Sequence, residues 1–86
     1  MTVNDFLQTC AYEVDVGLTT KRDPISDCST EYNQEDFIAL NCAGSYFKYD
    51  HLKELLRRIG NKKVVSFRNT YDLNDCFDGI IVVYES

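Results

Sequence analysis

The order of apolar and polar residues divides the chain into segments of helical period and of strand period. From Val3 to Cys10, apolar residues recur at intervals of three and four, as they do along one face of a helix. Thr2 stands before them and Asp5 three residues later, which is the spacing of a capping box with aspartate in place of glutamate. The pattern predicts a short helix that begins after Thr2.

Residues 11–18 change to a period of two, because Tyr12, Val14, Val16 and Leu18 alternate with smaller or polar residues. This alternation is typical of a half-buried strand. Three further segments, 36–42, 64–70 and 80–85, also have strand character. Residues 72–79 are rich in turn-forming types, so we expect the last two strands to form a hairpin.

A second helix is predicted over residues 51–59. Asp50 is the expected N-cap and Gly60 the expected C-cap. The apolar stripe of this helix consists of Leu52, Leu55, Leu56 and Ile59. Lys53, Arg57 and Arg58 fall on the opposite side, which we expect to face solvent.

Residues 19–34 show neither period, and they contain the only proline, Pro24. Five acidic residues fall here and just beyond without an intervening base: Asp23, Asp27, Glu31, Glu35 and Asp36. The segment is predicted to be a long loop. Loops of this length in a compact domain are usually functional, disordered or wrongly assigned, and a metal or a partner could order this one.

These elements predict an α+β fold in the order α-β-β-α-β-β, with two short helices packed on a four-stranded antiparallel sheet. A chain of 86 residues suits one domain, so residues 1–86 are predicted to form a single domain. The sequence contains neither a stretch of about 18 apolar residues nor a signal-peptide pattern. A cytoplasmic protein without a membrane partner is therefore the expectation.

The formal net charge is −5, and it is unevenly distributed. Residues 1–50 carry nine acids and three bases, whereas residues 51–86 carry five acids and six bases. An acidic protein is repelled by nucleic-acid backbone, so direct nucleic-acid binding is disfavoured. A protein partner with a basic surface is favoured, with Asp23, Asp27, Glu31, Glu35 and Asp36 as the expected contacts. The alternative is that the acidity only maintains solubility.

The four cysteines, Cys10, Cys28, Cys42 and Cys76, form no C-x-x-C pair. Antiparallel pairing of the first two strands would place Cys10 near Cys42, and His51 opens the following helix. With Cys28 from the loop, or Cys76 in place of one ligand, these residues could form a tetrahedral Cys₃His zinc site of structural type. Buried free thiols are the first alternative, and disulfides are the second.

No common catalytic motif is present. The chain has a single histidine, and it lacks H-E-x-x-H and G-x-S-x-G. Residues 72–78 space their oxygen-bearing side chains like a calcium loop, but Phe77 occupies the position that requires glycine. A Cys–His nucleophile pair through His51 is the one enzymatic alternative that the composition leaves. The sequence predicts a protein that is not an enzyme.

Three segments carry a resemblance to a known group of proteins, namely MTVNDFL at residues 1–7, LKELL at 52–56 and DGIIVVYE at 78–85. They resemble small proteins of Firmicutes phages and mobile elements. The acidic composition, with four cysteines and one histidine, is similar to a zinc-containing family of type II anti-CRISPR proteins. The resemblance implies an inhibitor that binds Cas9 and blocks the loading of target DNA. The alternative is a small zinc-stabilised structural or regulatory module with a protein partner.

Overall fold

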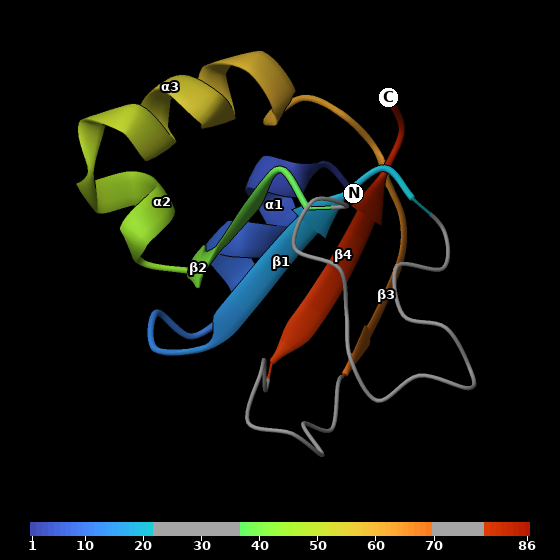
Figure 1. Cartoon of the computed structure of the whole chain (residues 1–86), viewed down its shortest axis with the longest axis horizontal. Helices are drawn as coiled ribbons and strands as arrows, with labels where there is room; N and C mark the ends of the chain where they lie inside the picture. Colours follow the sequence, from blue (N-terminus) through green and yellow to red (C-terminus); the bar gives the residue numbers. More distant parts are fainter. Residues whose placement is uncertain (22–36, 70–78) are drawn as a thin grey trace.

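The computed structural model describes residues 1–21, 37–69 and 79–86, and it folds them into an α+β arrangement (Figure 1). In chain order, the helices and strands of these residues are α1 (Val3–Thr9), β1 (Asp15–Thr19), β2 (Ala39–Cys42), α2 (Ser45–Lys48), α3 (Asp50–Ile59), β3 (Val64–Asn69) and β4 (Ile80–Tyr84). The predicted fold class is confirmed. The sequence pattern does not predict α2, because four residues are too few to show a helical period.

The sheet is mixed, so the prediction of a purely antiparallel sheet is wrong. Its strand order is β2-β1-β4-β3. β1 pairs antiparallel with β2, and β3 pairs antiparallel with β4, as expected, but β1 and β4 run parallel. β4 is apolar at every position, from Ile80 to Tyr84. Such a strand is suited to the centre of a sheet, where both of its faces are covered.

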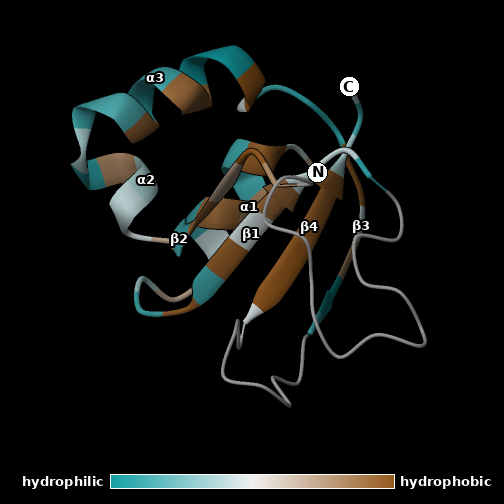
Figure 2. Ribbon diagram, viewed as in Figure 1, coloured by the Kyte–Doolittle hydropathy of each residue, from teal (hydrophilic) through white to brown (hydrophobic). Residues whose placement is uncertain are grey.

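One face of the sheet forms the main core together with the three helices. β1 contributes Val16 and Leu18 to this core, and β4 contributes Val82 and Tyr84. The helices supply Val3, Phe6 and Leu7 from α1, Tyr46 from α2, and Leu52, Leu55 and Ile59 from α3. Figure 2 shows the alternation of apolar and polar residues along α3, and the apolar character of β4 over almost its whole length.

A second, smaller cluster lies on the other face of the sheet. Ile81 and Val83 of β4 pack there with Phe37 and Leu40. Gly17 of β1 permits this packing, because a Cβ atom at that position would lie 2.7 Å from Leu40 Cδ2 and 3.0 Å from Phe37 Cδ1. Both faces of the sheet are therefore covered over β1 and β4.

The capping box at the start of α1 is confirmed. The backbone N–H of Asp5 donates to Thr2 Oγ1 at 3.1 Å, and the N–H of Thr2 donates to Asp5 Oδ2 at 3.2 Å. The preceding backbone is also held, because the N–H of Val64 donates to the carbonyl of Met1 at 2.8 Å. The start of the chain thus lies against the start of β3.

α3 begins one residue earlier than predicted. Its N-cap is Tyr49, whose side chain makes no capping hydrogen bond, and Asp50 lies in the first turn. A carboxylate in the first turn still interacts favourably with the helix dipole. Gly60 is the C-cap, as expected. No helix among the described residues is long and apolar enough to span a membrane.

Candidate functional site

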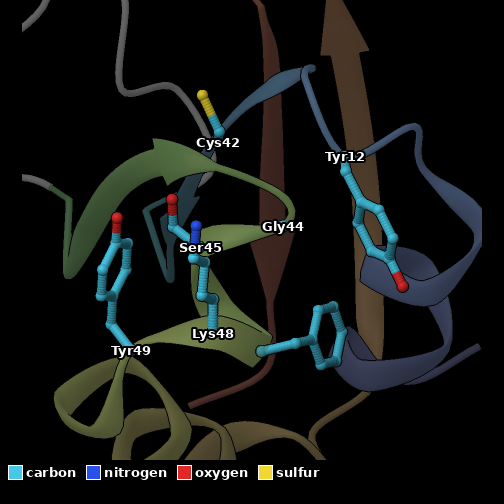
Figure 3. Close-up of a pocket in the computed structure, with 7 residues that line it drawn as sticks. Tyr12, Cys42, Gly44, Ser45, Lys48 and Tyr49 are labelled. Carbon is cyan, nitrogen blue, oxygen red and sulfur yellow. The ribbon is translucent and has the colours of Figure 1, made fainter.

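An open pocket of about 460 Å³ lies beside α2, and we call it the α2 pocket. Its lining residues are Tyr12, Cys42, Gly44, Ser45, Phe47, Lys48 and Tyr49. Figure 3 shows Tyr12 and Tyr49 on opposite sides of the pocket, with Ser45 and Lys48 between them. The pocket is therefore rimmed by large aromatic side chains, and Lys48 is the one charged lining residue among those that the structure describes.

Tyr12 reaches the pocket from a turn that replaces the predicted start of the first strand. The N–H of Val14 donates to the carbonyl of Ala11 at 3.1 Å, so the extended backbone begins only at Asp15. The N–H of Gly44 donates to the carbonyl of Tyr12 at 3.1 Å, which fixes this turn against the start of α2. As a result, the Tyr12 side chain is 65% exposed.

The short helix α2 is anchored to the sheet by Tyr46. This residue is 0% exposed, and its hydroxyl donates to the carbonyl of Val16 in β1 at 3.0 Å. Burial raises the pKa of the Tyr46 hydroxyl well above its usual range, so it remains a neutral donor. Because the next residues are Phe47, Lys48 and Tyr49, this anchor positions the aromatic rim of the pocket.

The rim side chains also contact one another. The rings of Tyr12 and Phe47 meet edge to face with their centroids 6.4 Å apart. The Lys48 Nζ atom lies 5.8 Å from the centroid of the Tyr49 ring, within the range of a cation–π contact. Tyr49 is nevertheless 48% exposed, so a large part of its surface is free to contact another molecule.

The two described thiols are held in the protonated form. The Cys42 thiol donates a hydrogen bond to Asp15 Oδ1 at 2.9 Å, and this bond raises the pKa of Cys42. Burial raises the pKa of the Cys10 thiol. Nucleophilic cysteines require the opposite shift, because the thiolate is the reactive form. These surroundings weigh against Cys10 or Cys42 as the nucleophile of an enzyme.

His51 lies apart from Cys42. It lines a separate pocket with Ile38 and Ala39 near the start of β2, whereas Cys42 is the last residue of that strand. The His51 ring stacks on the ring of Tyr49, with the two ring centroids 6.2 Å apart. The structure thus gives no pairing of a histidine base with the Cys42 thiol.

The structure does not group the three predicted zinc ligands that it describes, Cys10, Cys42 and His51. The antiparallel pairing of β1 and β2 places Asp15, not Cys10, opposite Cys42, because the turn at residues 11–14 separates Cys10 from the strand. Cys10 and Cys42 are free thiols. Over residues 1–21, 37–69 and 79–86, no three side chains of His, Cys, Asp or Glu are grouped to hold a metal ion.

Other predicted site residues lie outside the described ranges. They are the metal ligand Cys28, its alternative Cys76, and the partner-binding set Asp23, Asp27, Glu31, Glu35 and Asp36. The calcium-like segment at residues 72–78 also lies outside them. A Cys₃His zinc site therefore stays a prediction, which metal analysis of the purified protein would test.

The sequence pattern did not reveal the α2 pocket. The pocket combines a turn residue, the end of β2 and three of the four residues of α2, so it depends on contacts between distant segments. The one local signal is the run of large residues at 46–49 directly after Gly44 and Ser45. No protein-family model, curated protein or solved structure matches this chain.

Proposed function

We propose that this chain is a non-enzymatic binding protein that docks a protein partner on the α2 pocket. The observation that carries the proposal is the pair of exposed tyrosines, Tyr12 and Tyr49, held on opposite sides of the pocket by a helix anchored in the core. Tyrosine is enriched at protein interfaces and among the residues that dominate binding energy. It presents a large contact area and orders few rotatable bonds on binding.

Binding is favoured over catalysis by the chemistry of the lining residues. The pocket offers a serine, a lysine and a thiol, but that thiol donates its proton to Asp15 and has a raised pKa. The histidine lines a different pocket. A general base within reach of the nucleophile is a geometric requirement of hydroxyl or thiol catalysis.

Cas9 is the partner that the resemblance suggests, and we propose it as the first candidate to test. The net charge of −5 supports a partner whose surface is basic outside the segment that docks in the pocket. A cleavage assay would compare Cas9 activity with and without the protein, added before or after target DNA. We expect inhibition only when the protein is added first. Full cleavage in both orders would exclude this partner and leave the docking surface itself to be tested with another.

The docking surface is tested with the substitutions Tyr12→Ala and Tyr49→Ala. Each should weaken binding to an identified partner by about 30-fold if the residue is a hot spot of about 2 kcal/mol. Both side chains are exposed, so the circular dichroism spectrum and melting temperature should change little. Phe67→Ala is the matched control, because Phe67 is an exposed aromatic residue outside the pocket. Equal effects of all three substitutions would contradict the proposal.

A further inference from the structure

A second pocket, the α3 pocket, adjoins the first. It has a volume of about 280 Å³, and its lining residues are Asn4, Tyr46, Phe47, Lys53, Leu56, Arg57, Gly60 and Asn61. Leu56 and the two aromatic residues give it apolar walls, and two amides and two cations supply its polar groups. Its composition thus allows an apolar side chain and an acidic group to be bound close together.

Phe47 lines both pockets. The α2 pocket and the α3 pocket therefore meet at one side chain that is half buried. Tyr46, the residue that anchors α2 to β1, also lines the α3 pocket. We call the two pockets together the α2–α3 groove. One bound segment could therefore contact both pockets across Phe47. The helix α2 that carries Phe47 is anchored to the sheet by Tyr46.

Among the residues that the structure describes, the charged ones that line the groove are all cations: Lys48, Lys53 and Arg57. This is the opposite of the net charge of −5. Arg57 pairs with Glu54 at 2.7 Å, but both side chains are more than half exposed, and exposed pairs of this kind are weak. A carboxylate on a partner could therefore compete for Arg57.

We infer that the α2–α3 groove binds an acidic segment of a protein partner that also carries an aromatic or large apolar side chain. The inference rests on the proposed function and specifies what the docking surface selects. The apolar side chain contacts Tyr12, Phe47 and Tyr49, and carboxylates contact the three cations. The local charge of the groove, rather than the net charge of the chain, determines this choice, because charges beyond about 8–10 Å are largely screened at physiological salt.

The phosphates of a nucleic acid could also pair with these three cations, but the negative charge of the rest of the molecule disfavours nucleic-acid binding. Affinity for nucleic acid comes mainly from neutralising many phosphates, and the groove provides three cations on a chain of net charge −5. A peptide brings its few carboxylates to the groove without a continuous line of charge that the remaining acidic surface would repel. The observations therefore favour an acidic peptide segment.

The test is a titration of the ¹⁵N-labelled full chain with a blocked synthetic hexapeptide of two glutamates, two aspartates and two phenylalanines. At physiological salt, where the distant acidic groups are screened, we expect shifts of the backbone amides of Phe47, Lys48, Tyr49, Lys53 and Arg57. The matched peptide with four lysines in place of the acids should not shift them. No binding of the acidic peptide, or equal binding of the basic one, would overturn the inference.

Charge reversal supplies the second arm of the test. Lys48→Glu with Lys53→Glu should weaken peptide binding at least tenfold. The control, Lys63→Glu with Arg68→Glu, changes the net charge equally at exposed positions that line neither pocket, and it should retain the affinity within about twofold. If both double variants lose the same amount of peptide affinity, the loss comes from the change in net charge and not from the groove. That result would overturn the inference.

Two further outcomes separate this inference from the proposed function. If Tyr12→Ala abolishes binding of an identified partner while reversal of Lys48 and Lys53 does not, the docking surface stands and the acidic specificity is wrong. If a single-stranded oligonucleotide displaces the peptide and binds more tightly at the same amides, the groove is a nucleic-acid site and the inference is also wrong. Loss of partner binding in both sets of variants supports both statements.

Discussion

The hydroxyl of Tyr46 provides the sharpest test of how α2 is held. In the substitution Tyr46→Phe, the buried ring stays, and the hydroxyl is lost together with its hydrogen bond to the carbonyl of Val16 and its interaction with the backbone of Asn41. A typical intramolecular hydrogen bond contributes about 1 kcal/mol net to stability. Because the hydroxyl is fully buried and its acceptor lies in the core strand β1, we expect a loss of about 1 kcal/mol rather than a smaller one.

Urea unfolding, followed by circular dichroism, measures this loss. With an m-value of about 1–1.5 kcal/mol/M, at the low end of the usual range because the chain is short, the midpoint should fall by roughly 0.7–1 M. The melting temperature should fall by about 4–8 °C, as expected for 1 kcal/mol in a domain of 60–100 residues. Tyr12→Phe is the control, since it makes the same chemical change on an exposed side chain and should leave the midpoint unchanged.

The same variant should affect the pocket. Loss of the anchor should speed amide hydrogen exchange in α2 and at Tyr49 more than in α1, whose cap does not involve Tyr46. Two results would refute the reasoning. One is an unchanged urea midpoint, and the other is a uniform rise in exchange over α1 and α2. Either would mean that the Tyr46 hydroxyl does not fix the position of α2.

Three further predictions follow from contacts elsewhere in the chain. Thr2→Ala removes one half of the capping box of α1 and should cost about 1 kcal/mol, measured by the same urea unfolding; an unchanged midpoint would mean that the cap contributes nothing. Burial raises the pKa of Tyr46, so the folded state retains a proton that the unfolded state loses above about pH 10. Stability should thus be complete below pH 10 and fall as the pH rises, and the fall should be shallower in Tyr46→Phe; an equal slope would contradict this assignment. Asp15→Ala removes the acceptor and the charge that raise the pKa of Cys42, so iodoacetamide should label Cys42 several-fold faster at pH 8. Cys10, mapped in the same digest, is the internal reference, and equal acceleration of both thiols would indicate unfolding instead.

Local rules predicted local structure well. The cap of α1 follows from Thr2 and Asp5, which are three residues apart and need no other part of the fold to meet. The apolar stripe of α3 and its end at Gly60 are also carried by neighbouring residues. Helix caps and apolar stripes can be predicted from the sequence because residues three or four positions apart share one face of a helix.

Long-range pairing was the part that the pattern could not supply. The alternation at residues 11–18 predicts one continuous strand, yet a backbone turn before Asp15 takes Tyr12 out of the sheet and into the pocket. β1 pairs parallel with β4, with Val16 opposite Ile80. The order of apolar and polar residues in the two strands does not indicate which strand pairs with which. The uniform apolar character of β4 was the available clue, because a strand buried on both faces belongs at the centre of a sheet.

The central position of β4 also bears on how the protein is made in the cell. β4 comes after the other three strands in the chain, yet it alone joins β3 to β1 and β2. Until residues 80–84 have been synthesised, the edges of β1 and β3 that pair with β4 have no partner strand. A nascent chain that stalls before Ile80 would thus expose unpaired strand edges of the kind that promote aggregation. The sheet is complete only when β4 has paired with both β1 and β3.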